Sequence, residues 1–192
     1  MASYPVDATH RFVRGTKGGK IRMATVVWYE HTPALGAAAA ILAATVLADS
    51  IPTILTANLT QPDVPRALLV KGNASTVAGT VLIEGTDTNG IPQSEVLALN
   101  GSAAVVGTKA FARVRRITLP PRAAGGNTVS VGTGNALGLW HALNADVRLV
   151  TTFDGLPDLG VLTCDPSAVS KNLFTPAGVL DGAKTLRLVY LV

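Results

Sequence analysis

Between residues 63 and 120 the chain alternates short apolar runs with turn residues, and this alternation constrains the fold more than any other feature. Each run is about as long as a β-strand, and turn residues separate neighbouring runs. Strands joined so tightly pair antiparallel, because a parallel pair needs a crossover of a dozen or more residues. The strands expected here are residues 66–71, 80–86, 91–99, 103–106 and 112–119.

The turn sequences sharpen this prediction. Asp87 to Gly90 predicts one turn, and Asn100-Gly101 predicts a two-residue hairpin of type I′, which needs positive φ at both central residues. Later strands are expected at 128–132, 146–153, 160–165 and 185–192, with a turn-rich link over 134–140. The spacing is typical of a sandwich or barrel. The sequence therefore predicts an all-β fold, an antiparallel β-sandwich or barrel-like domain, over residues 58–192.

Residues 1–57 are expected to form an extended N-terminal arm and a linking segment. Residues 1–20 show no periodicity, residues 21–29 favour a strand, and the Ala-rich residues 34–48 fit either a helix or an extended segment. The apolar run is shorter than the roughly 17–25 residues of a transmembrane helix. It also begins too late to be the apolar core of a signal peptide. We therefore expect it to belong to the folded protein.

Charge and aromatic content favour contacts with other proteins. Charged residues make up 15% of the chain, against about 25% in an ordinary globular protein. This suits either a surface covered by other subunits or a compact Ala- and Val-rich domain. The net charge is +4, but the basic groups are not interleaved with aromatics, so we expect no specific nucleic-acid partner. The candidate subunit contacts are Arg11, Arg14, Lys17, Lys20, Trp28, Arg113, Arg115 and Trp140.

No catalytic or metal-binding pattern is present in the sequence. The histidines, His10, His31 and His141, are dispersed, and no G-x-S-x-G motif accompanies them. A zinc site needs Cys or His at short spacing, whereas Cys164 is the single cysteine. We therefore predict a non-enzymatic protein without a cofactor.

Two motifs resemble those of tailed-bacteriophage virion structural proteins. Residues 61–66 (QPDVPR) are similar to an "NPDVPRN" entry motif, and residues 134–139 (GNALGL) to a "GNKLGLP" segment. The similarity also includes residues 80–86, 107–111, 117–120 and 172–181 and the closing apolar strand, so that the resemblance covers roughly residues 58–192. Trp140 stands where the pattern often has proline.

The resemblance implies a capsid decoration or cement protein, which stabilises the phage head through subunit contacts. Its partners would be the major capsid protein or other virion proteins, and it would form a homo-oligomer, with a trimer favoured. It would be located in the virion, after assembly in the host cytoplasm, and would not associate with a membrane. The alternatives are a neck or tail component, and a carbohydrate- or surface-binding β module that uses Trp28 or Trp140.

Overall fold

The computed structural model describes residues 10–13 and 22–192, and their fold is all-β and antiparallel, as predicted. One 3-10 turn, η1 (Val169–Lys171), interrupts the strands. The strands are β1 (His10–Val13), β2 (Arg22–His31), β3 (Leu42–Val46), β4 (Thr53–Leu55), β5 (Arg66–Gly72), β6 (Thr80–Thr86), β7 (Pro92–Ala98), β8 (Val105–Phe111), β9 (Arg113–Leu119), β10 (Thr128–Gly138), β11 (Arg148–Phe153), β12 (Leu156–Pro157), β13 (Val161–Thr163), β14 (Leu173–Thr175) and β15 (Leu186–Leu191).

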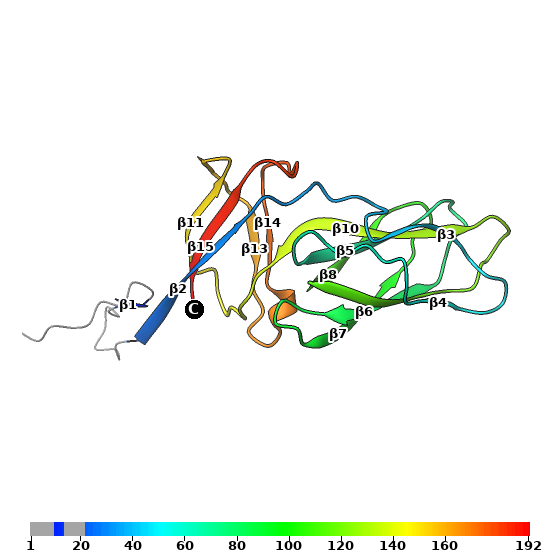
Figure 1. The fold of residues 1–192 in the computed structure, drawn as a ribbon, viewed down its shortest axis with the longest axis horizontal. Coiled ribbons are helices and arrows are strands. Elements are labelled where there is room, and N and C mark those ends of the chain that lie inside the picture. The colour runs from blue at the N-terminus through cyan, green and yellow to red at the C-terminus, as the bar shows by residue number, and fades with distance from the viewer. Residues whose placement is uncertain (1–9, 14–21) are drawn as a thin grey trace, which may run out of the picture.

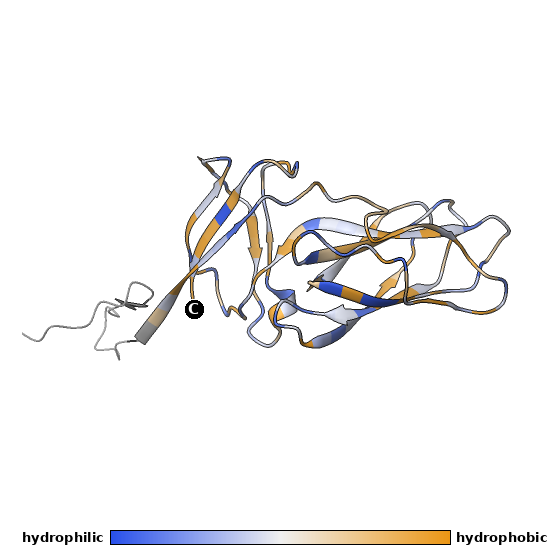
Figure 2. Ribbon diagram, in the orientation of Figure 1, coloured by the Kyte–Doolittle hydropathy of each residue, from blue (hydrophilic) through white to orange (hydrophobic). Residues whose placement is uncertain are grey.

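Three sheets make two halves that share β10 (Figure 1). In the larger half, the sheet β4-β9-β6-β7 faces β3, β5, β8 and the first part of β10. In the smaller half, the sheet β1-β2-β15-β11-β12 faces β13, β14 and the end of β10. In Figure 2, β15 carries hydrophobic residues, drawn orange, interrupted by a hydrophilic one, drawn blue. Each half consists of two layers with a hydrophobic core between them, and β10 connects the two halves.

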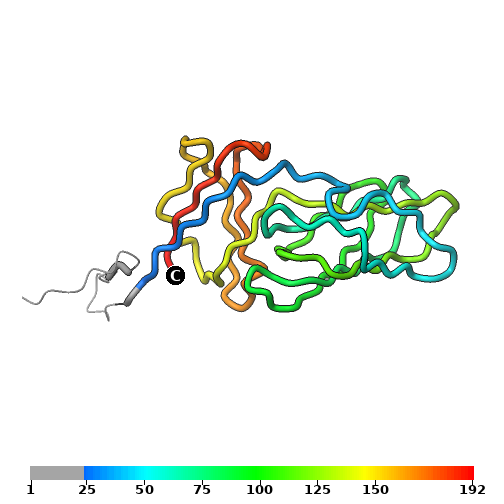
Figure 3. Tube along the Cα trace, viewed as in Figure 1, coloured from blue at the N-terminus to red at the C-terminus, as the bar shows by residue number. Residues whose placement is uncertain are grey.

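The strands that precede residue 58 belong to these sheets. β2 pairs with β15 over residues 26–31, and the two strands run side by side in Figure 3. The remaining part of β2, residues 22–25, pairs with β1. The start of β2 therefore continues beyond the end of the sheet formed with β15 and projects from the body in Figure 1.

The Ala-rich segment is extended, so the helical alternative for it is wrong. Residues 42–46 form β3, which pairs with β10. A Cβ added to Gly132 of β10 would lie only 1.9 Å from the Ala37 carbonyl oxygen, so the two backbones touch directly. Ile41 and Leu42 enter the core of the larger half. β3 thus forms through its pairing with a distant strand, which helix propensity alone does not reveal.

Two turn predictions are wrong in an informative way. Asn100-Gly101 makes a tight turn with a bridge to Ala103, but only Gly101 has positive φ (58°). β7 and β8 on either side belong to different sheets, so the chain crosses over instead of forming a hairpin. Residues 134–138 continue β10 instead of forming a link. Their glycines serve close packing: a Cβ on Gly138 would lie 2.3 Å from the Ala110 Cβ.

Candidate functional site

The expected contact residues are distributed over both halves. Arg14, Lys17 and Lys20 lie outside the described residues, and Arg11 is described only as a backbone position of β1 paired with Ala24. Trp28 lies on the outer face of the smaller half with 60% of its surface exposed. Trp140 is half-buried, and the centre of its ring lies 5.5 Å from the ring centre of Tyr29 and 6.0 Å from that of His31. Arg113 and Arg115 line one hollow in the larger half.

The outer face of the smaller half carries a row of apolar side chains. Trp28 of β2 lies opposite Val189 of β15, which lies opposite Val150 of β11. Trp28 and Val150 are both exposed. In the next row, Arg187 donates to Glu30 at 2.8 Å and places its guanidinium 5.9 Å from the centre of the Trp28 ring. The charges beside the row are therefore paired, which leaves a neutral apolar surface.

A hollow of about 570 Å³ extends this surface along β11. The register between β11 and β15 shifts so that Leu149 is an extra residue between Arg148 and Val150. Leu149, Val150 and Leu159 line the hollow, and Leu159 is 90% exposed. The polar groups there are engaged: Arg148 donates to Asp146, and Asp158 accepts from the backbone N–H of Gly160 at 2.7 Å. We call Trp28, Val189, Val150, Leu149 and Leu159 the apolar face.

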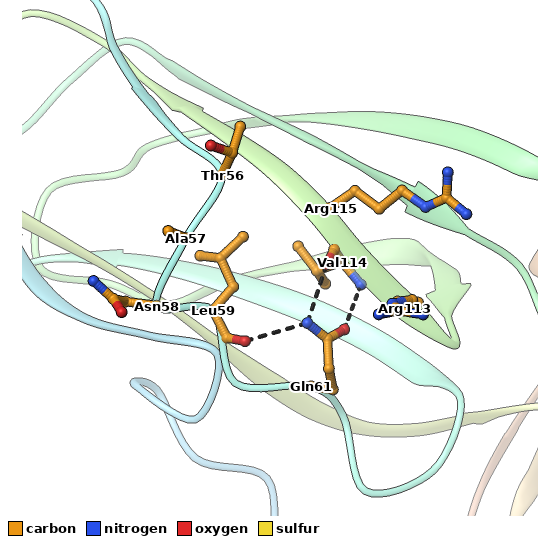
Figure 4. A pocket seen from close by; sticks show the side chains of 8 residues that line it. All are labelled: Thr56, Ala57, Asn58, Leu59, Gln61, Arg113, Val114 and Arg115. Carbon is orange, nitrogen blue, oxygen red and sulfur yellow. Dashed lines mark hydrogen bonds between the residues drawn. The ribbon is translucent and has the colours of Figure 1, made fainter.

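A second hollow, of about 460 Å³, lies at the edge of β9 in the larger half (Figure 4). β4 covers β9 only over residues 117–119, and the chain then bends away from the sheet over residues 56–60. It returns at Gln61, whose amide pairs with Val114 as a strand would: Val114 N donates to Oε1 at 2.8 Å and Nε2 donates to the Val114 carbonyl at 3.1 Å. The space between the loop and β9 is the hollow.

A β-bulge turns both arginines of this hollow outward. β6 pairs Glu84 with Arg116 and Gly85 with Val114, which leaves Arg115 as the extra residue of β9. The bulge resets the alternation of the strand, so that Arg113, Arg115 and Arg116 are all exposed while Val114 and Ile117 are buried. Gly85 permits this bulge, because a Cβ there would lie 1.9 Å from the Arg113 carbonyl oxygen. We call the space beside Gln61, Arg113 and Arg115 the basic hollow.

A buried arginine, paired with a partly exposed aspartate, joins the two motifs that resemble phage proteins. Arg66, with no exposed surface, donates to Asp63 Oδ1 at 2.7 Å, to the Gly134 carbonyl at 2.8 Å and to the Ala34 carbonyl at 3.0 Å. Burial by itself raises the pKa of Asp63, but hydrogen bonds from Ala34 N and Arg66 outweigh it and lower the pKa. Residues 34, 63–66 and 134 are thus held at one point near the junction of the halves.

His31 and His141 do not line either hollow. His141 Nδ1 lies 3.2 Å from the Tyr190 hydroxyl, and burial raises the pKa of that tyrosine to about 12. Burial lowers the pKa of His31, while Asp63 opposes the shift. Within residues 10–13 and 22–192, no three His, Cys, Asp or Glu side chains are placed to hold a metal ion. In the same residues, no helix is long and apolar enough to cross a membrane.

Sequence reasoning found some of these residues and missed others. It named Trp28, Arg113 and Arg115 as candidate contacts and Gln61 and Arg66 only as members of the motif 61–66, and it did not name Val150 or Leu149. A strand around Trp28 is indicated by the β-rich residues 21–29, whereas the two bulges and the Gln61 amide contacts depend on pairing between distant segments. No family model, curated protein or solved structure matches the chain.

Proposed function

We propose that this chain is a non-enzymatic structural protein of a tailed-phage virion, a capsid decoration protein that associates with copies of itself and with neighbouring virion proteins. The observation that carries the proposal is the apolar face. Trp28 lies on a sheet that already has a packed core on its other side, so the described residues leave its outward surface exposed, and contact with another protein would bury it. Tryptophan beside arginine is also the composition typical of energetic centres of protein interfaces.

The motifs 61–66 and 134–139 give the proposal its phage context, and the buried Arg66 gives them a shared structural role. Because Arg66 and Gly134 bond directly, the two motifs act as one unit. A rigid body of this kind suits a protein that fills a place in a lattice. The charge pairs beside Trp28 favour association of like surfaces, since a neutral face does not repel its copy.

Self-association is tested by sedimentation velocity on the full chain. We expect an oligomer for the unmodified protein and at least tenfold weaker association for Trp28→Ser. Val96→Ser is the matched control, because Val96 is also 60% exposed on an outer sheet face, that of β7 in the larger half. A monomeric unmodified protein, or equal effects of the two substitutions, would refute the role of the apolar face.

Location in the virion is tested by immunogold labelling of virions whose genome encodes the chain. Label on the head supports a decoration protein. Label on the neck or tail assigns the protein to that structure instead, and absence of the chain from purified virions, checked by mass spectrometry, excludes a virion role. Heads that lack the protein should also lose thermal resistance.

A further inference from the structure

Arg113 and Arg115 differ from the other arginines of the body. After residue 23 the chain has seven arginines, and five of them lie beside a carboxylate: Arg66, Arg116, Arg122, Arg148 and Arg187. Arg113 and Arg115 have no carboxylate partner among the described residues, and they are two positions apart in the same hollow. The body therefore pairs its arginines and leaves two of them together, facing solvent.

We propose that the basic hollow binds an extended acidic segment of a partner protein, with carboxylates at alternate positions. An extended chain places residues i and i+2 on one side, roughly 6.6 Å apart. Two such carboxylates can face Arg113 and Arg115, which are also two positions apart and both exposed. Each guanidinium presents a planar pair of donors that matches a carboxylate. Figure 4 shows both arginines beside Gln61 among the residues that line the hollow.

The surroundings of the hollow favour a protein segment over a nucleic acid. A nucleic-acid backbone is bound by a long cationic stripe, with one contact for each of several phosphates. Here the next cation along β9, Arg116, is already paired with Glu84, so the cationic stretch ends after two residues. The hollow, about 460 Å³, accommodates a few side chains, and its loop wall contributes the polar residues Thr56 and Asn58. A short acidic peptide fits this charge and size.

The N-terminal charge requires a test that resolves individual residues. Residues 1–22 contain five of the 16 Lys and Arg and one of the 12 Asp and Glu, so the net charge of +4 is confined to them and the rest is balanced at eleven of each sign. Any acidic probe can associate with such a segment without specificity. The inference rests on the proposed function only in taking the partner to be a protein.

The experiment is an NMR titration of the full ¹⁵N-labelled protein with the peptide acetyl-Glu-Thr-Glu-amide. We expect saturable shifts of the Arg113 and Arg115 Nε–Hε signals and of the Val114 amide, reduced by salt, and no comparable shifts with acetyl-Gln-Thr-Gln-amide. Shifts confined to residues 1–22, or absent, would overturn the proposal. Tighter binding of an oligothymidylate at the same signals would assign the hollow to nucleic acid and overturn it as well.

Paired variants separate the hollow from general charge. Arg113→Gln combined with Arg115→Gln should weaken the peptide affinity, measured on the Val114 amide, by roughly tenfold or more. Lys71→Gln combined with Lys109→Gln removes the same charge from the body outside the hollow and should change affinity by less than about twofold. Equal losses would contradict the proposal. If the peptide fails to bind while virions still contain the chain, this inference fails and the proposed function stands.

Discussion

The two halves of the molecule carry similar surface features but differ in the side chains that these features present. Each has exposed apolar side chains on an outer sheet face, a Glu–Arg pair between neighbouring strands, and a bulge beside a hollow. In the larger half the extra residue of the bulge is Arg115, and in the smaller half it is Leu149. The same backbone device therefore presents a cation at one hollow and an apolar side chain at the other, which suits two kinds of contact.

The two cores also differ, in their content of aromatic residues. Nine aromatic residues are present in the chain, and seven of them have described side chains. Phe111 belongs to the larger core, while Tyr29, Trp140, Phe153, Phe174 and Tyr190 pack in or against the smaller one, and Trp28 lies on its outer sheet. The core of the larger half is thus mainly aliphatic, whereas the smaller half contains most of the aromatic side chains, which contribute strongly to protein interfaces.

The largest effect should come from breaking the link near the junction of the halves. Arg66→Met leaves the Ala34 and Gly134 carbonyls without their donor, at about 1–3 kcal/mol each, so we expect a loss of about 2–5 kcal/mol. Asp63 loses its charge partner as well but is partly exposed, so it adds little. Urea unfolding followed by both tryptophan fluorescence and far-UV circular dichroism measures it. Because both tryptophans lie in the smaller half, transitions that separate between the two probes would show that the halves unfold independently.

The control for this change is Arg122→Met, which removes an exposed pair with Asp49. It should cost less than about 1 kcal/mol. A similar small loss for Arg66→Met would contradict the view that this buried group holds the three segments together.

A smaller loss of stability should follow from a substitution that crowds the bulge of the larger half. Gly85→Ala introduces a Cβ that meets the Arg113 carbonyl, so β6 or β9 must move, at about 1–3 kcal/mol. Gly125→Ala is the matched control, because an added Cβ there meets nothing within 4 Å. The same urea titration compares them. Equal stability of the two variants would show that the bulge adapts freely and that its arginines are not held in place.

Much of this fold could be predicted from the sequence, because alternation and turn residues act locally. Residues 80–86 were expected as a strand and form β6, and Asp87 makes the next turn by accepting from the N–H groups of Asn89 and Ile91. The type of turn could not be predicted as well. The two residues with positive φ in a tight hairpin are Asp154 and Gly155, between β11 and β12, and not Asn100-Gly101.

The remaining features depend on contacts between distant residues. Glycine occurs both in turns and where backbones pack closely. Gly134 and Gly138 therefore suggest a turn-rich link in the sequence, although in the structure they continue β10. The basic hollow illustrates the same limit. The sequence indicates Arg113 and Arg115 as candidate contacts. Arg116 is the same residue type on the same strand, but it is paired with Glu84, which is 32 positions away in the sequence. Pairing of this kind is a property of the sheet, not of the local sequence.

The smallest predicted effect distinguishes the halves by pH. Burial lowers the pKa of His31 and of His141, and both lie in the smaller half. The unfolded chain therefore binds protons first as the pH falls below about 6.5, so the free energy of unfolding should decrease from that pH downward and stay level above it. Asp63 beside His31 limits the decrease, because its charge favours the protonated ring.

Tryptophan fluorescence during thermal unfolding at several pH values between 8 and 5 measures this dependence in the half that contains both histidines. The double variant His31→Gln and His141→Gln should keep a level midpoint across the range, whereas the unmodified chain loses stability toward pH 5. If the variant falls as steeply, the dependence comes from carboxylates, whose lowered pKa values belong to a more acidic window. A level response of the unmodified chain would mean that the two rings bind protons as readily in the folded chain as in the unfolded chain. The contrast would then lie in the surfaces of the two halves and not in their cores.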